Sequence, residues 1–219
     1  MASPFDLTGP LMPPASGGPP KQIVLLVHGL VSDGNDLIGL APSWAPLLPD
    51  AVFVSPNAPF PCDMAPMGYQ WFSLADRSPD SKLAGVRATA PILDAFVDSL
   101  LQRFNLGADK LALVGFSQGT MMSLYIAPRR PQAVAGVVGY SGAMVGADVL
   151  TNETKSKPPI LLVHGTGDPV VPHQATEQAA EALKSAGLAV DVMLRPGLPH
   201  SIDEPGLRAG GTFLKRVLA

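Results

Sequence analysis

Unbroken apolar runs recur along this chain and alternate with segments whose apolar residues have helical spacing. The runs cover Gln22–His28, Ala51–Ser55, Lys110–Gly115, Val134–Ser141 and Pro159–His164. The helical patterns cover Leu83–Phe104, Gln118–Ala127 and Gln174–Ser185, followed by a strand pattern over Ala189–Arg195 and a helical one from about Glu204 to Leu218. Aliphatic runs of this length suit strands covered on both faces. The alternation predicts an α/β fold with a mostly parallel, doubly wound sheet and helices on both faces.

The chain shows no internal repeat and no change of composition that would mark a second domain. Residues 21–219 are therefore predicted to form one domain. Residues 1–20 are rich in Pro and Gly and are expected to form an extended lead-in with at most a short strand. The connection between Ser141 and Ile160 is too short for a large cap domain.

Charge and hydropathy exclude several classes of partner. The net charge is −3 and no cluster of Lys and Arg could neutralise a phosphate backbone, so no nucleic acid is expected to bind. The apolar runs are much shorter than the roughly 20 residues of a membrane-spanning helix. Residues 1–20 lack the Lys or Arg and the apolar core of a secretory signal. These features predict a cytoplasmic protein without stable membrane insertion.

The pentapeptide Gly115-Phe116-Ser117-Gln118-Gly119 lies between a predicted strand and a predicted helix. A serine at such a sharp turn needs glycine two residues to either side, because a Cβ there would collide with neighbouring backbone. Its hydroxyl then projects beyond the carboxyl edge of the sheet, where the sites of such folds lie. Ser117 is therefore the candidate nucleophile. The alternative is a Gly/Ser turn without chemistry.

A serine hydroxyl needs a general base at neutral pH, and in this arrangement the partners follow in the order Ser, acid, His. That order excludes His28 and disfavours His164, which precedes the best candidate acid. His173 opens a predicted helix, where a surface or capping role explains it. His200 lies in a loop between the last strand and the last helix, from which an imidazole can reach over the serine. His200 is the predicted base.

The predicted acid is Asp168, which follows a strand through a short Gly-Thr-Gly turn. Its carboxylate emerges at the same edge of the sheet as Ser117, where it can orient His200 and stabilise the imidazolium that forms. The alternative is a turn aspartate that bonds its own backbone. Asp148 and Asp191 are poorer candidates, since the first lies in a connection and the second inside a strand.

Acyl transfer also needs backbone NH donors for the oxyanion of its tetrahedral intermediate. One donor is normally the residue after the nucleophile, here Gln118, and the second comes from the loop after an earlier strand. Leu30 occupies that loop. We therefore predict an oxyanion hole formed by the NH groups of Leu30 and Gln118, with a simple turn at Leu30 as the alternative. His28 is expected to brace this loop.

The segment Pro56–Ser73 is a long loop that contains both prolines and large apolar residues. Loops of this kind often bind ligands. Trp71, Met64 and Met67 are candidate substrate contacts, because aromatic rings and adaptable Met side chains suit an alkyl chain. They suit ordinary packing equally well, so both interpretations stay open. Cys62 in the same loop lacks the basic neighbours that would activate its thiol.

A group of polar residues, Asp33, Asn35 and Asp36, lacks the spacing of a calcium-binding EF-hand loop and its distant Glu. These residues are expected to form a turn and an N-cap for a helix that begins near Leu37. No metal site is predicted.

Several ordered motifs together resemble the phospholipase/carboxylesterase family, whose eukaryotic relatives include acyl-protein thioesterases. The motifs are His28-Gly29-Leu30, Asp33-Gly34-Asn35-Asp36-Leu37, Pro56-Asn57-Ala58-Pro59, Trp71-Phe72, Gly115-Phe116-Ser117-Gln118-Gly119, His164-Gly165-Thr166-Gly167-Asp168 and Pro199-His200. The resemblance extends from about Gln22 to the C-terminus and implies an α/β-hydrolase fold. Val31 and Ser32 depart from it, because many relatives have a Gly-rich sequence there.

The resemblance implies a triad of Ser117, Asp168 and His200, with Leu30 and Gln118 in the oxyanion hole. The activity expected is that of a serine carboxylesterase on short- to medium-chain esters, without any cofactor. An acyl-protein thioesterase or a lysophospholipase acting on longer acyl chains is the alternative. A non-catalytic binding protein is a third hypothesis, against which the complete triad argues. The expected partner is a small acyl ester or thioester, and a homodimer is compatible with the sequence.

Overall fold

The computed structural model describes residues 7–219 and is built around a seven-stranded sheet of order β1-β3-β2-β6-β7-β8-β9. Its strands are β1 (Leu11–Met12), β2 (Gln22–Val27), β3 (Ala51–Val54), β6 (Leu111–Phe116), β7 (Gly136–Tyr140), β8 (Ile160–Gly165) and β9 (Val190–Arg195). β1 pairs antiparallel with β3, and the other neighbouring strands pair in parallel. The predicted mostly parallel sheet is confirmed, and β1 is the short strand expected in the lead-in. Residues 1–6 of that lead-in lie outside the described residues.

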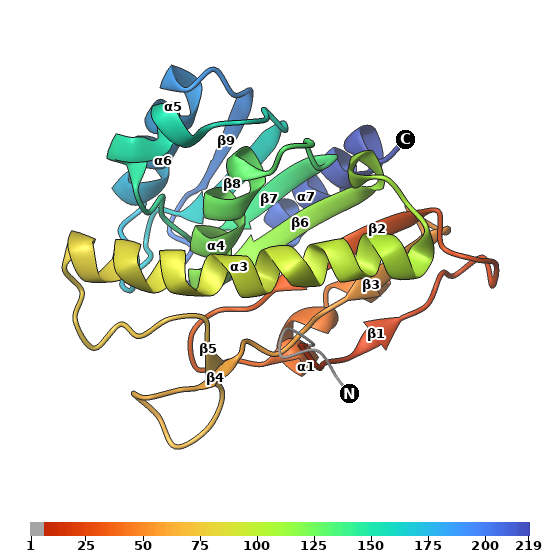
Figure 1. Ribbon diagram of the computed structural model, residues 1–219, viewed down its shortest axis with the longest axis horizontal. Coiled ribbons are helices and arrows are strands. Elements are labelled where there is room, and N and C mark those ends of the chain that lie inside the picture. Colours follow the sequence, from red (N-terminus) through yellow and green to blue (C-terminus); the bar gives the residue numbers. More distant parts are fainter. Residues whose placement is uncertain (1–6) are drawn as a thin grey trace.

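Helices cover both faces of the sheet, with α3 and α4 in front and α7 behind in the view of Figure 1. The helices are α1 (Gly34–Ile38), α2 (Ala41–Trp44), α3 (Pro79–Phe104), α4 (Gln118–Ile126), α5 (Ala147–Glu153), α6 (Gln174–Ser185) and α7 (Glu204–Val217), with 3₁₀ turns at Ala108–Lys110 and Ala127–Arg129. The predicted doubly wound arrangement is therefore present.

The central strand β2 shows how the sequence builds these layers. Successive side chains of a strand point to opposite faces. Ile23, Leu25 and Val27 accordingly join the core beneath α3, α4 and α6. Val24 and Leu26 join the core beneath α1, α2 and α7. Because all of these side chains are fully buried, an apolar residue is needed at every position of the strand, as the unbroken run predicted.

The sequence analysis did not predict α2, α5 or a hairpin formed by β4 (Phe60–Pro61) and β5 (Tyr69–Gln70). The hairpin lies inside the segment Pro56–Ser73, where prolines interrupt any strand pattern. α5 lies between β7 and β8 and has seven residues. The connection therefore holds a short helix and no large cap domain, as expected from its length.

Side-chain caps determine where two helices begin. Asp33 accepts hydrogen bonds from the NH groups of Asn35 at 2.8 Å and Asp36 at 3.1 Å, which confirms an N-cap in this polar group. The helix begins at Gly34, however, and not near Leu37 as predicted. Ser78 caps α3 in the same way. The helix therefore begins before Leu83, where its apolar periodicity starts, because a capped first turn needs no apolar residue.

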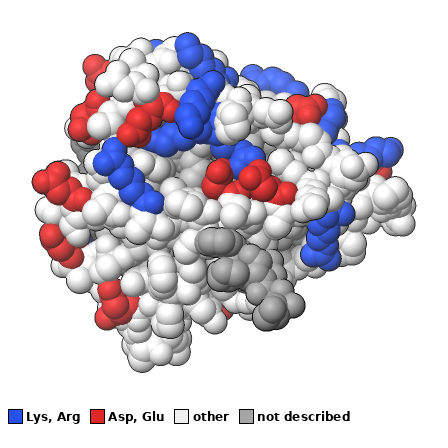
Figure 2. All heavy atoms as spheres, viewed as in Figure 1, with Lys and Arg blue, Asp and Glu red and all other residues white. Residues whose placement is uncertain are grey.

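No helix within residues 7–219 is both long and apolar enough to cross a bilayer. On the face that carries α3, basic and acidic side chains are interspersed, and no continuous basic surface is visible there (Figure 2). Asp94 and Asp98 of α3, for example, pair with Arg130.

Candidate active site

Ser117 stands at the sharp turn between β6 and α4, with φ 53° and ψ −115°. This positive-φ backbone conformation is one that non-glycine residues rarely adopt. The turn is tightly packed: a Cβ added to Gly115 would lie 2.5 Å from the backbone nitrogen of Thr120, and one added to Gly119 would lie 1.8 Å from the carbonyl oxygen of Val27. The predicted need for glycine on both sides of Ser117 is therefore confirmed.

Asp168 and His200 lie together at the carboxyl edge of the sheet. His200 Nδ1 is 2.6 Å from Asp168 Oδ2, and Asp168 Oδ1 accepts hydrogen bonds from the NH groups of Val170 at 2.8 Å and Val171 at 2.9 Å. Burial alone would raise the pKa of the Asp168 carboxyl, but the hydrogen bonds from His200, Val171 and Val170 lower it below its usual value. Asp168 is therefore a carboxylate at neutral pH and can accept the Nδ1 hydrogen of His200.

His164 also contacts Asp168, and this contact was not predicted. Its Nε2 lies 3.1 Å from Asp168 Oδ2 and 2.9 Å from the carbonyl oxygen of Val171, while its Nδ1 lies 2.6 Å from the hydroxyl of Thr176. Because two acceptors face Nε2, that nitrogen carries the hydrogen, and Thr176 donates to Nδ1. The side chain of His164 is fully buried. His164 therefore donates a second hydrogen bond to the Asp168 oxygen that faces His200, a contact that can orient this carboxylate.

The protein should lose stability as the pH falls below about 6.5. Burial lowers the pKa of both His28 and His164, so between those lowered values and about 6.5 the unfolded chain binds more protons than the folded one. The free energy of unfolding therefore decreases as the pH falls through this window, by at most about 1.4 kcal/mol per pH unit for each group. Urea midpoints measured on both sides of the window should show a smaller acid loss for His164→Gln than for the wild type. Equal losses in the two proteins would contradict the conclusion that the lowered pKa of His164 contributes to the acid sensitivity.

A cavity of about 410 Å³ contains the predicted residues Ser117, His200, Leu30 and Gln118 in its lining. Its apolar walls come from Leu74, Met121, Ala143, Val171 and Ala175. The ring of His200 also packs at 4.8 Å, centroid to centroid, against that of Phe116. The structure thus places the candidate nucleophile and base on the surface of one pocket that has room for a small ligand.

The loop after β2 carries Leu30 into this pocket. No residue within 7–219 accepts a backbone hydrogen bond from the NH of Leu30, and the NH of Gln118 lies in the first turn of α4, where a helix supplies no acceptor. Val31 has φ 65°, a strained value for a β-branched residue. Its NH donates to the carbonyl of Tyr69 at 3.0 Å, and the NH of Tyr69 donates to the carbonyl of Ser32 at 2.9 Å. The hairpin strand β5 therefore holds the loop in this shape.

Trp71, Met64 and Met67 do not line the pocket, although they were the candidate substrate contacts. Trp71 is fully buried, and its indole NH donates to the carbonyl of His28 at 3.0 Å. Met64 and Met67 are 47% and 73% exposed on the hairpin loop. Trp71 therefore packs in the core, which was the alternative interpretation of this residue. The two methionines lie outside the lining of the pocket.

Gln118 contributes more than its backbone. Its side-chain Oε1 accepts from the NH of Trp71 at 2.8 Å, and its Nε2 donates to the carbonyl of Phe72 at 2.7 Å. His28 braces the neighbouring loop as predicted, because its Nδ1 lies 2.7 Å from the Gly29 carbonyl and its Nε2 accepts from the NH of Ala58 at 2.9 Å. These buried contacts join the nucleophile turn and the loop after β2 to the segment Pro56–Ser73.

The sequence analysis missed the apolar wall of the pocket. Met121 stands one helical turn after Ser117, so helix geometry alone could have identified it. Val171 follows Asp168 closely in the chain, and this proximity is a weaker signal. Leu74 and Ala143 are brought in by tertiary packing. No group of His, Cys, Asp and Glu suited to holding a metal ion occurs within the described residues.

Comparison with known proteins gives a matching family model, two related proteins and a similar solved structure. A family model described as Phospholipase/Carboxylesterase matches residues 14–218. Esterase YpfH of Escherichia coli is 34% identical over 191 residues, which are 87% of this chain and 80% of that protein. The crystal structure of esterase PE8 superposes with a TM-score of 0.92 at 41% identity and covers 97% of this chain and 99% of its own. Acyl-protein thioesterase 1 of Debaryomyces hansenii is 29% identical over 93% of this chain and 94% of that protein.

Proposed function

The chain belongs to the phospholipase/carboxylesterase family of α/β-hydrolases and is a hydrolase that acts on esters; on this premise we propose that it is a serine carboxylesterase for short- to medium-chain esters. The observation that carries the proposal is the pocket itself. Ser117 and His200 line it together, and Asp168 lies 2.6 Å from the far nitrogen of the His200 ring. This arrangement supports Ser117, His200 and Asp168 as the nucleophile, base and acid of acyl transfer.

In the proposed reaction Ser117 Oγ attacks the acyl carbonyl while His200 Nε2 takes its proton. The NH groups of Leu30 and Gln118 stabilise the oxyanion, and His200 passes the proton to the leaving alkoxide. Water then hydrolyses the acyl-enzyme by the reverse proton path, which restores the Ser117 hydroxyl and releases the carboxylic acid. The Asp168 carboxylate keeps His200 in the tautomer that leaves Nε2 free to accept.

The size of the pocket supports short and medium acyl chains. At about 410 Å³ it lies near the small end of the range for ligand sites. It must accept both the acyl group and part of the alcohol. The alternative is an acyl-protein thioesterase or lysophospholipase, which is supported by the thioesterases among the relatives. A non-catalytic binding role is disfavoured, because it would not need Ser117 in a strained backbone conformation.

Hydrolysis of 4-nitrophenyl esters from acetate to palmitate will separate the two catalytic alternatives. We expect kcat/KM to be highest between acetate and octanoate, because longer chains exceed the pocket. Activity confined to the longest chains would contradict the carboxylesterase proposal and favour the alternative. A matched alkyl thioester measured beside each oxygen ester will test thioester preference.

We further propose that residues 21–219 form one domain, which the family match over residues 14–218 supports. The cytoplasmic location and the homodimer stay predictions.

A further inference from the structure

Two basic side chains, Arg77 and Lys82, line the otherwise largely apolar pocket of Ser117. Arg77 lies in the exposed segment before α3, and Lys82 lies half-buried in the first turn of that helix. Within residues 7–219 neither has a carboxylate at ion-pair distance. Hydrogen bonds from Ser78, and also the charge of Lys82, lower the pKa of the Asp76 carboxyl, so this carboxylate acts on Lys82 from beyond ion-pair distance. The pocket therefore presents two cations to its contents, and neither is paired directly with a protein anion.

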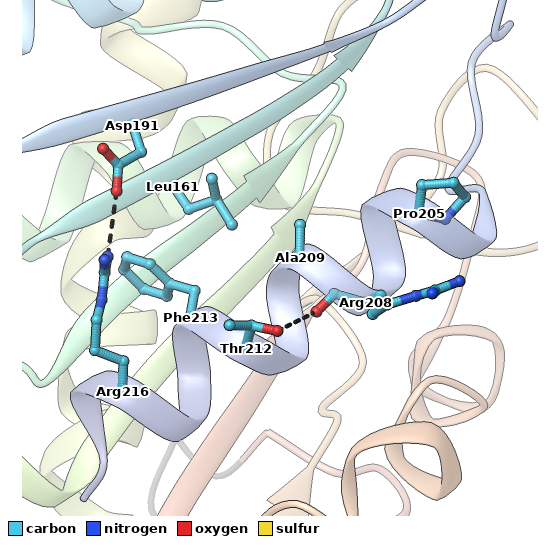
Figure 3. Close-up of a pocket in the computed structure, with 8 residues that line it drawn as sticks. All are labelled: Leu161, Asp191, Pro205, Arg208, Ala209, Thr212, Phe213 and Arg216. Atoms are coloured by element: carbon cyan, nitrogen blue, oxygen red, sulfur yellow. Dashed lines mark hydrogen bonds and ion pairs between the residues drawn. The ribbon is translucent and has the colours of Figure 1, made fainter.

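Basic residues in two other cavities are paired. A cavity of about 540 Å³ between α7 and the sheet contains Arg216, which pairs with Asp191 at 3.2 Å (Figure 3), and Arg208, which pairs with Glu204 at 2.7 Å. Both arginines of this cavity therefore have carboxylate partners, unlike Arg77 and Lys82.

The same holds for a cavity of about 290 Å³ between α3 and α4. It is lined by Arg87 and Arg129, and both bind Glu153, at 2.8 Å and 2.6 Å. The cations of the Ser117 pocket thus differ from the arginines of these two cavities, which have carboxylate partners.

Two acidic residues are near these cations in sequence, Asp76 beside Arg77 and Asp80 two residues before Lys82, and neither lines the pocket. Asp76 accepts hydrogen bonds from the NH of Ser78 at 2.8 Å and from its hydroxyl at 3.0 Å. Asp76 is not part of the pocket lining, whereas Arg77 and Lys82 are. A negatively charged ligand group in the pocket would thus meet the cations without facing this carboxylate directly.

We propose that the substrate is an ester that also carries an anionic group, such as a carboxylate or a phosphate, and that Arg77 and Lys82 bind this group. The inference rests on the proposed esterase activity of Ser117. Guanidinium and ammonium groups recognise such oxyanions by charge-assisted hydrogen bonds. The apolar walls contact the hydrocarbon part of the same molecule. The anion belongs either to the acyl part or to the alcohol part of the ester.

Pairs of esters that differ only in charge test this proposal. For the acyl part, the pair is 4-nitrophenyl valerate and mono(4-nitrophenyl) glutarate; for the alcohol part, it is 4-acetylphenyl acetate and 4-carboxyphenyl acetate. Each kcat/KM is divided by the rate of uncatalysed hydrolysis. We expect the wild type to prefer the anionic member of at least one pair, and high salt to reduce that preference.

The double variant Arg77→Gln/Lys82→Gln should lower the preference by about tenfold or more, because one charge pair at about 4 Å in water contributes roughly fivefold. The readout is the ratio within each pair of esters, so a change in the rate of the neutral ester alone does not decide the test. The double variant Arg208→Gln/Arg216→Gln makes the same change of charge on α7 and should leave the preference unchanged. A loss restricted to one pair of esters identifies the part of the substrate that carries the anion.

Two outcomes would overturn the proposal. If the neutral esters are hydrolysed but no variant changes the ratio within either pair, the anion site is wrong and the esterase proposal stands. If no ester is hydrolysed and a fluorophosphonate does not label Ser117, both proposals fail together.

Discussion

Replacement of Ser117 by Ala should lower kcat/KM for 4-nitrophenyl butyrate by about 10⁴-fold or more, since residual catalysis then comes from binding and the oxyanion donors alone. The expected size follows from the roles proposed for one hydroxyl, which both attacks the carbonyl and receives the proton at the end of the cycle. Intact mass spectrometry after treatment with a fluorophosphonate should show one adduct on the wild type and none on the variant.

A suitable control is Ser123→Ala on the same helix. Ser123 donates to the carbonyl of Gly119 at 2.8 Å and is fully buried, so its hydroxyl affects local packing without lining the pocket. That variant should keep its label and most of its activity. Equal labelling of Ser117→Ala and the wild type would show that the nucleophile is another residue.

Replacement of His200 by Ala should lower kcat by about 10⁴-fold, with a small effect on KM, because the base acts on proton transfer and contributes little to ground-state binding. The Ser117 hydroxyl would then have no base within the proposed site, while the oxyanion donors and the apolar walls would be unchanged. Steady-state kinetics on the same ester measure both constants, and circular dichroism verifies that the fold is intact.

His173→Ala is the matched control for this variant. His173 lies at the N-terminus of α6, makes no side-chain capping bond and does not line the pocket. Its replacement should therefore change kcat by less than about twofold, because substitutions outside the core and the site have small effects. Near-normal turnover by His200→Ala, or a large loss in His173→Ala, would refute the assignment of the base.

The order of the chemical groups along the chain was predictable because it depends on local rules. The apolar runs identify strands covered on both faces, and the glycines around Ser117 identify a turn that no larger residue allows. Asp168 and His200 could be selected because each follows a predicted strand, and the carboxyl ends of parallel strands meet at one edge of the sheet. The family resemblance rests on these same positions.

The side chains in and around the pocket could not be predicted from such local rules. Trp71 is a residue type that often contacts ligands, but its position inside the core depends on the hairpin of β4 and β5. That hairpin was not predicted, because prolines interrupt the strand pattern there. His164 was set aside as a base, and its contact with Asp168 depends on the shape of the turn that joins these two residues, four apart in the chain. Arg77 and Lys82 carry no motif.

The sequence by itself determined the order of the candidate catalytic residues along the chain: a serine at a sharp turn, an acid after one strand and a histidine after the next strand. This order was readable because backbone sterics and strand direction act over a few residues. Tertiary structure decided which side chains surround Ser117. Those neighbours come from segments far apart in the chain, and their positions depend on how complete helices and loops pack against the sheet. The pattern of residues therefore predicts the reaction, and the packing of the loops supports the proposal for its substrate.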